Sequence, residues 1–171
     1  TTDKGICDLL VAMQLVRSNF PEAHLLVAGA EDATTPLPKS TSRLLDAPGI
    51  IELGHFEDMP KFFHALDIFC LPSYREGMPT VNLEASASGI AVVTTPATGC
   101  IDSIIDGETG RLSPLRDPDG LAQVLCQLLG QPSLSARMGS SGRVWAESHF
   151  GQSSVWEAQL AFLDSLVNGS G

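Results

Sequence analysis

The chain has 171 residues, of which 43% are hydrophobic and 18% charged, so it contains enough apolar material for one globular domain with a buried core. Its formal net charge of −10 disfavours binding to nucleic acid and to anionic lipid surfaces. No apolar run approaches the roughly 18 residues that a membrane-spanning helix needs. The four cysteines are widely spaced and form no Cys-x-x-Cys pair, which argues against a disulfide framework and favours a reducing, cytoplasmic location.

The first part of the chain alternates between helical and strand patterns. Residues 5–19 carry apolar side chains at helical spacing. A polar surface loop is expected at 30–40, leading into a weaker helix near 39–46, and Asp58 is placed to cap a helix at 59–66. Short apolar runs, each typical of a buried parallel strand, occur at 25–29, 50–53 and 67–73.

The alternation continues with a helix at 81–88, a strand at 90–95, a short helix near 101–106 and a small strand at 110–112. It predicts an α/β fold with a Rossmann-like parallel sheet flanked by helices. Ligands bind such sheets beyond the carboxyl ends of the strands. The sequence places four small or polar residues at those ends: Gly29, Gly54, Ser73 and Thr95.

The last third of the chain has helical patterns only. Asp117 and Pro118 are placed as the N-cap and first residue of a helix, which we favour over a metal-binding Asp-x-Asp motif. Further helices are expected at 133–148 and 152–167, as a helical C-terminal tail. In these helices we also predict an interrupting turn at Gly139–Gly142 and core positions for Trp145 and Trp156.

The start of the pattern is unusual. The chain opens with Thr-Thr-Asp-Lys-Gly and a helix, whereas a doubly wound domain normally opens with a strand. We therefore expect the first strand to be missing, which leaves unpaired backbone in the middle of the sheet. A homodimer through this unpaired sheet edge is one expected way to cover it.

Two glutamates, Glu76 and Glu84, stand eight positions apart around a Gly-Met-Pro-Thr turn. If a helix starts near Thr80 or Val81, Glu84 lies in its first turn and Glu76 on the loop before it. Both carboxylates then face one crevice at a helix N-terminus, where backbone N–H groups can hold phosphate and carboxylates can accept from sugar hydroxyls. The simpler interpretation is a pair of surface acids that the helix dipole favours at that position.

The surrounding residues resemble a known signature. The segment PSYREGMPTVNLEASASGIAVVTT, residues 72–95, is similar to the donor-site motif of the retaining glycosyltransferases of family four, the glycosyl transferases group 1, whose two glutamates fall on Glu76 and Glu84. The resemblance covers most of the chain. Other family motifs occur in order at Asp3-Lys4-Gly5, Leu26-Val27-Ala28-Gly29, Leu53-Gly54-His55-Phe56, Asp67 to Ser73 and Asp106-Gly107-Glu108-Thr109-Gly110.

The resemblance implies the C-terminal half of a GT-B fold and a retaining, hexosyltransferase-type transfer from a nucleoside-diphosphate sugar. It makes Glu76 the catalytic carboxylate beside the donor sugar and Glu84 the ligand of the ribose hydroxyls. Lys4 would neutralise the departing diphosphate, so that no metal or other cofactor is needed, and Phe56 would lie near the base. The backbone of a short segment would line the sugar and diphosphate: Gly77, Met78, Pro79, Thr80 and Val81.

The chain also departs from the commonest family pattern. Pro79 and Thr80 stand where a second glycine and a leucine are usual, a form familiar in bacterial surface-polysaccharide transferases. The arginine that the family carries on or just after its first strand has no counterpart here. We therefore expect one donor-binding domain over 1–171, with 133–171 as a C-terminal helical extension, and little or no transfer by this domain alone.

The expected partners are a UDP- or GDP-sugar donor and a glycan or lipid-linked sugar acceptor, bound with an N-terminal domain that the chain lacks. Nucleic acid is not expected, and the full-length enzyme is expected in the cytoplasm, at the inner face of the membrane. Two alternatives stay open: a non-catalytic or truncated nucleotide-sugar-binding module, and a nucleotide-sugar epimerase of similar architecture.

Overall fold

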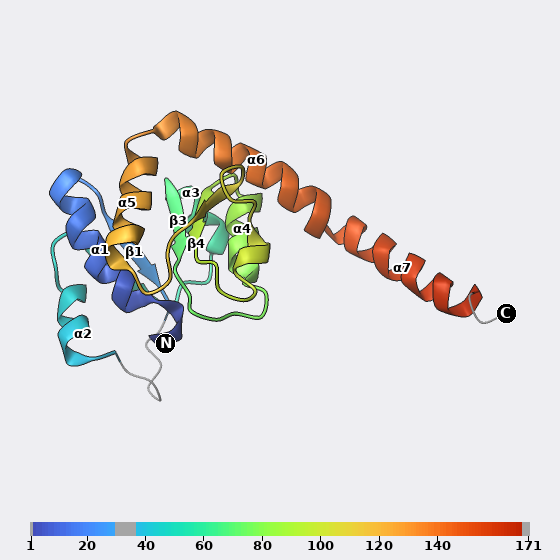
Figure 1. The fold of residues 1–171 in the computed structure, drawn as a ribbon, viewed down its shortest axis with the longest axis horizontal. Helices are drawn as coiled ribbons and strands as arrows, with labels where there is room; N and C mark the ends of the chain where they lie inside the picture. The colour runs from blue at the N-terminus through green and yellow to red at the C-terminus, as the bar shows by residue number, and fades with distance from the viewer. Residues whose placement is uncertain (1, 30–36, 169–171) are drawn as a thin grey trace.

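The computed structural model describes residues 2–29 and 37–168, so most of the loop expected at 30–40 lies outside the described residues. Figure 1 shows an α/β body with one long helix projecting from it. The elements in chain order are η1 (Thr2–Lys4), α1 (Ile6–Asn19), β1 (Leu25–Ala28), α2 (Lys39–Leu45), β2 (Ile50–Gly54), α3 (Met59–His64), β3 (Ile68–Leu71), α4 (Thr80–Ala87), β4 (Ala91–Thr94), η2 (Ile101–Ser103), β5 (Gly110–Leu112), α5 (Pro118–Leu129), α6 (Pro132–Phe150) and α7 (Gln152–Asn168).

The strands are all parallel, which confirms the predicted sheet type. They form two groups: β1 pairs with β2, and β4 lies between β3 and β5. The register joins Leu25 to Ile50 in the first group and Ile68 to Ala91 in the second. The described strands thus form a sheet in two parts, with β1 and β3 not paired to one another.

Helices cover both faces of the sheet, and β4 shows why the strands are uniformly apolar. All four of its residues are buried, because successive side chains point to opposite faces. Ala91 and Val93 pack into a cluster with α1 and α5, here called the α1–α5 cluster. Val92 packs into a second cluster with Phe62, Phe63 and Ala85, here called the α3–α4 cluster.

Two helix starts agree with the capping residues in the sequence. The Asp58 side chain accepts from the Lys61 N–H at the start of α3. Asp117 accepts from the Gly120 N–H at 2.9 Å, and Pro118 opens α5. The Asp117 carboxylate is therefore used as an N-cap, as expected. The short helix predicted at 101–106 is only the single turn η2, because the backbone becomes extended at Ile104.

The predicted turn at Gly139–Gly142 is wrong, because α6 runs without interruption from Pro132 to Phe150. The glycines allow a close approach instead. A Cβ on Gly139 would lie 2.0 Å from the carbonyl oxygen of Gly89 and 3.2 Å from the amide nitrogen of Ala91. A missing side chain thus lets α6 rest directly on the backbone between α4 and β4.

We expect Gly139→Ala to lower the free energy of unfolding by about 1–3 kcal/mol, because the overpacking cost exceeds the gain of about 1 kcal/mol in helix propensity. Gly142→Ala is the matched control, since its Cβ would meet no atom closer than 3.3 Å. Urea denaturation of the two variants measures the difference. Equal stability of both variants would contradict the close approach at Gly139.

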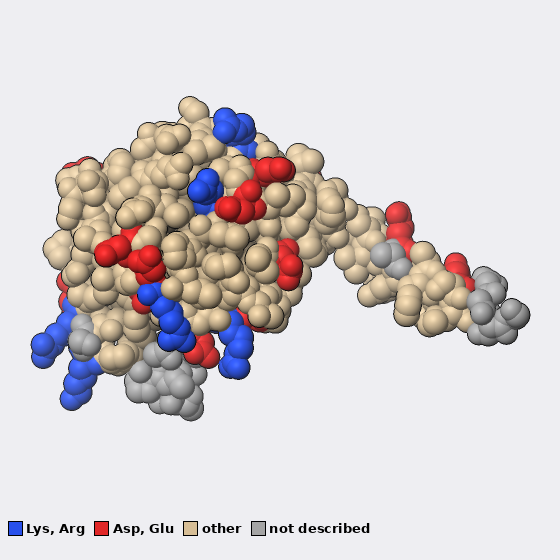
Figure 2. Space-filling view, viewed as in Figure 1, with Lys and Arg blue, Asp and Glu red and all other residues tan. Residues whose placement is uncertain are grey.

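The helix α7 leaves the body of the domain, and the prediction that Trp156 lies in the core is wrong (Figure 1). Trp156 is 57% exposed, and other apolar side chains of this helix, such as Leu160 and Phe162, are exposed as well. Trp145 is half-buried on α6, with its ring centroid 5.1 Å from that of Phe150. In Figure 2 the projecting helix is mostly uncharged, with acidic side chains and no basic ones.

Within residues 2–29 and 37–168, no helix combines the length and apolar character needed to cross a membrane. The division into a domain with an extension at 133–171 stays a prediction. We note that α6 packs against α4, β4 and β5, whereas α7 contacts α6.

Candidate functional site

Two predicted site residues meet at the carboxyl end of β3. The Lys4 ammonium lies 2.6 Å from Oε1 of Glu76, although the two residues are 72 positions apart. The Glu76 side chain is only 14% exposed and that of Lys4 is 51% exposed. The Ser73 hydroxyl lies 2.7 Å from the same Glu76 oxygen and 2.9 Å from the Asp3 carbonyl oxygen. Glu76 is therefore a partly desolvated carboxylate with one exposed cation beside it.

The start of the chain is fixed against β3 by backbone contacts. The Tyr74 N–H donates to the Asp3 carbonyl oxygen at 2.8 Å. Gly5 follows in a left-handed conformation with φ of 70°, and a Cβ there would lie 2.0 Å from the Pro72 carbonyl oxygen. Only glycine fits this position, so the sequence Lys-Gly places Lys4 at the strand end and starts α1 immediately afterwards.

A second glycine supports the loop that carries Glu76. The Glu76 N–H donates to the Thr98 carbonyl oxygen at 3.2 Å, which ties this loop to the segment after β4. Gly99 has φ of 78°, and a Cβ there would lie 2.0 Å from the Gly77 carbonyl oxygen. The two loops at the carboxyl ends of β3 and β4 thus pack backbone to backbone, at the edge of the sheet where the sequence predicts the site.

The rest of the glutamate motif leads into α4. Pro79 is buried and precedes Thr80, the first residue of the helix, while Gly77, Met78 and Thr80 are exposed and Val81 is half-buried. Glu84 is exposed. We predicted it in the first turn of α4, but it is the fifth residue of the helix and lies beyond that turn. The helix dipole therefore stabilises the Glu84 carboxylate less than predicted, because the effect of the dipole fades beyond the first turn.

Phe56 lies after β2, on the loop predicted to approach a base. It is half-buried, its ring packs 6.2 Å from the ring of Phe62, and it belongs to the edge of the α3–α4 cluster. The Phe56 side chain thus packs against the core, which leaves the backbone of the loop as the part available to contact a ligand.

A further group beside Glu76 was missed in the sequence. The Tyr74 hydroxyl donates to Oδ2 of Asp8 on α1 at 2.8 Å, and the Arg116 guanidinium lies 4.4 Å from the centre of the Tyr74 ring. Arg116 has φ of 55°, a conformation that non-glycine residues adopt rarely. The three residues are far apart in sequence and follow no motif, so no local signal could have identified them.

Burial, with the Asp8 carboxylate as a second cause, raises the pKa of Tyr74 to about 12. Since Tyr74 is the only tyrosine, tyrosinate absorbance near 295 nm reports this group alone. The folded protein should titrate well above pH 10, and the unfolded protein in guanidinium near pH 10. Stability from this group should be complete below about pH 10 and lost as the pH rises towards 12. A titration midpoint near pH 10 in the folded protein would contradict the Asp8 contact. So would a Tyr74→Phe variant that loses as much stability at alkaline pH as the original chain.

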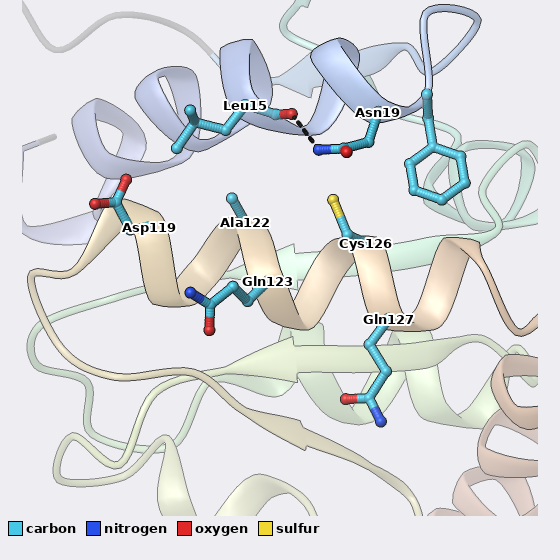
Figure 3. A pocket seen from close by; sticks show the side chains of 8 residues that line it. Leu15, Asn19, Asp119, Ala122, Gln123, Cys126 and Gln127 are labelled. Atoms are coloured by element: carbon cyan, nitrogen blue, oxygen red, sulfur yellow. Dashed lines mark hydrogen bonds between the residues drawn. The ribbon is translucent and has the colours of Figure 1, made fainter.

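A surface hollow lies away from Lys4 and Glu76. It has a volume of about 780 Å³ and lies between α1 and α5, lined by Leu15, Asn19 and Phe20 from the α1 side and by side chains of α5 (Figure 3). Burial raises the pKa of the Cys126 thiol on this wall, which favours its protonated form. Neither Lys4 nor Glu76 lines it. Among the residues that the structure describes, no group of three His, Cys, Asp or Glu side chains could hold a metal ion.

Comparisons with known proteins match most of the chain. The family model described as "Glycosyl transferases group 1" matches residues 1–131. The capsular polysaccharide biosynthesis glycosyltransferase CapM of Staphylococcus aureus is 30% identical over 97% of this chain and 43% of its own length. A D-inositol 3-phosphate glycosyltransferase of Streptomyces scabiei is 31% identical over 90% of this chain and 36% of its own length. The chain thus spans less than half the length of these curated relatives.

Solved structures agree on the fold. HepE of Anabaena, in complex with UDP-glucose, superposes with a TM-score of 0.86 at 20% identity, over 96% of this chain and 46% of that one. The C-terminal domain of the group 1 glycosyl transferase LpcC from Francisella tularensis gives a TM-score of 0.81 at 23% identity, over 89% of this chain and 82% of that one. The predicted α/β architecture is confirmed.

Proposed function

The chain belongs to the glycosyl transferases group 1 family, and we propose that it binds the nucleoside-diphosphate sugar donor of a retaining glycosyl transfer. The observation that carries this proposal is the Lys4–Glu76 pair at the carboxyl end of β3. An exposed cation beside a sheltered carboxylate offers one partner for a diphosphate and one for a sugar. Support also comes from the structural neighbour HepE, which has been solved in complex with UDP and with UDP-glucose.

Each residue has a distinct proposed role. Lys4 neutralises the diphosphate as it departs, and Glu76 positions and stabilises the donor sugar at its reacting carbon. The backbone from Gly77 to Val81, in which Gly77, Met78 and Thr80 are exposed, lines the sugar and diphosphate. Glu84 accepts from the ribose hydroxyls, and the backbone beside Phe56 meets the base.

In the proposed reaction the bond between the anomeric carbon and the phosphate oxygen breaks, and its electron pair leaves with the diphosphate. The acceptor hydroxyl forms the new bond on the same face of the sugar, and its proton passes to the departing phosphate oxygen. Negative charge grows on the diphosphate during this step, so the ammonium of Lys4 stabilises the transition state more than the ground state. No metal is assigned a role in this scheme.

Calorimetric titration of the folded chain with UDP and with GDP tests the proposal. We expect saturable binding of at least one nucleotide, competed by the corresponding nucleotide sugar. AMP and free ribose serve as controls for non-specific binding. A folded sample that binds neither UDP nor GDP at millimolar concentration would refute an intact donor site.

We expect Glu84→Ala to weaken binding of the preferred nucleotide about tenfold, because one or two hydrogen bonds from the ribose to a carboxylate are lost. The 2′-deoxy nucleotide should bind more weakly to the original chain but not more weakly to the variant. Glu22→Ala is the matched control, since Glu22 is an exposed acid just before β1, at the amino end of the sheet. An undiminished preference for the ribonucleotide in Glu84→Ala would move the ribose contact elsewhere.

A second candidate is a non-catalytic module that binds the donor without transferring from it. Nucleotide release from UDP- or GDP-sugars separates the two: release abolished by Glu76→Ala supports a catalytic domain. Membership of the glycosyl transferases group 1 family favours the catalytic domain and the non-catalytic module over a nucleotide-sugar epimerase.

The acceptor, in this proposal, is a glycan or lipid-linked sugar of a polysaccharide pathway, held with help from polypeptide outside this chain. A cytoplasmic location, with the whole enzyme at the inner face of the membrane, also stays a prediction. So does pairing of two copies through the sheet edge.

A further inference from the structure

Tyr74 contacts the chain on both sides of Lys4. Its backbone N–H donates to the carbonyl oxygen of Asp3 at 2.8 Å, and its side-chain hydroxyl donates to Oδ2 of Asp8 at 2.8 Å. Asp3 is the residue before Lys4, and Asp8 lies in the first turn of α1, which begins after Lys4 and Gly5. One residue at the end of β3 thus holds the segment that carries the Lys4 ammonium from its two ends.

The Tyr74 ring is itself held from a third part of the chain. The Arg116 guanidinium, on the loop between β5 and α5, lies 4.4 Å from the centre of the ring, a distance typical of a cation–π contact. Arg116 has φ of 55°, and such strained conformations of non-glycine residues are found preferentially at functional sites. The contacts from Asp8 and Arg116 therefore restrict a ring that is only half-buried.

The Lys4 ammonium depends on this support because a lysine side chain is long and flexible. Ordering its stem costs conformational entropy. The ion pair with Glu76 holds the ammonium only weakly, since the Lys4 side chain is 51% exposed. The position of the ammonium is therefore set mainly by the backbone of residue 4. Glu76 follows Tyr74 by two residues, so Tyr74 connects the backbones of both members of the pair.

We infer that Tyr74 is a positioning residue, which holds Lys4 opposite Glu76 through its hydroxyl bond to Asp8 and thereby prepares the ammonium for the diphosphate of the donor. The inference rests on the proposed function, in which Lys4 contacts that diphosphate. Tyr74 itself makes no contact with the nucleotide in this scheme. A cation that is already in place binds an anion more tightly than one that must be ordered during binding. Loss of the hydroxyl should therefore weaken nucleotide binding through Lys4 alone.

Titration calorimetry of Tyr74→Phe with UDP and GDP tests this dependence on Lys4. We expect the affinity for the preferred nucleotide to fall about fivefold, but by less than about 1.5-fold when the same change is made in Lys4→Met. Ser135→Ala is the matched control and should bind as the original chain does. It removes one buried hydroxyl bond, to the Leu128 carbonyl oxygen, near the amino ends of β3 and β4. An equal loss of affinity in both backgrounds, or no loss in either, would overturn the inference.

Hydrogen exchange without nucleotide separates this inference from the proposed function. The amide of residue 74, which is bonded to Asp3, should exchange about tenfold faster in Tyr74→Phe, whereas the amide of Leu25, bonded to Gly49, should not change. Unchanged exchange at residue 74 would overturn the inference, whatever the affinity for nucleotide. Faster exchange in a chain that binds neither UDP nor GDP would instead refute the proposed function, and with it the role of Tyr74 at the donor.

Discussion

Replacing Lys4 with methionine should weaken the binding of UDP or GDP about 30-fold while changing the Tm by no more than about 1 °C. The ammonium is half-exposed, so its pair with Glu76 contributes little to folding. A diphosphate would make a charge-assisted contact with the same ammonium, worth about 1.5–3 kcal/mol, which corresponds to the expected loss of affinity. Methionine keeps most of the apolar stem and removes the ammonium, with its charge and its hydrogen-bond donors.

Titration calorimetry of Lys4→Met at low and at moderate salt measures this effect. Lys61→Met is the matched control, because Lys61 is an exposed lysine paired with Asp58 at 2.9 Å on α3. The affinity of the original chain should fall with salt more steeply than that of Lys4→Met, since the variant lacks one cation at the diphosphate. Equal affinity of Lys4→Met and Lys61→Met would show that the phosphates bind elsewhere.

The fold could be predicted from the sequence where a local rule determines the structure. Asp58 and Asp117 cap helices through their own side chains, and the apolar run at 90–95 is continuous because β4 is covered on both faces. The failures concern tertiary contacts. From the sequence, Gly139 was predicted to interrupt a helix, but in the structure it allows the helix to pack against Gly89. The apolar face that carries Trp156 was predicted to lie in the core, but α7 projects from the domain.

At the candidate site, too, single residues could be predicted from the sequence, whereas the contacts between them could not. The resemblance named Lys4 and Glu76 separately, but no spacing rule predicts a 2.6 Å contact between residues 72 positions apart. That contact depends on Gly5 and on the Asp3 carbonyl, which fix the start of the chain to Tyr74. Ser73 appeared in the sequence only as a strand end, whereas the structure gives it a hydrogen-bonding position beside Glu76.

Replacing Glu76 with glutamine should have opposite effects on binding and on chemistry. In the structure the Glu76 carboxylate holds Lys4, so an incoming diphosphate must compete with it for the ammonium. Two unit charges about 6 Å apart repel by roughly 3 kcal/mol at an effective dielectric constant of 20, and solvent screening reduces this further. We therefore expect UDP or GDP to bind about five- to twentyfold more tightly to Glu76→Gln. Glutamine keeps the shape of the side chain and can still accept from Ser73.

Sugar transfer or donor hydrolysis should instead fall by about 100-fold or more, because the positive charge that develops on the sugar loses its carboxylate. Calorimetry with the nucleotide and an assay of nucleotide release measure the two effects on the same samples, with Glu22→Gln as the control. Combining Lys4→Met with Glu76→Gln removes the competition for the ammonium, so any gain in affinity that Glu76→Gln still gives in the Lys4→Met background measures the direct repulsion between Glu76 and the diphosphate. Weaker nucleotide binding by Glu76→Gln would contradict this competition and would place Glu76 among the groups that hold the nucleotide itself.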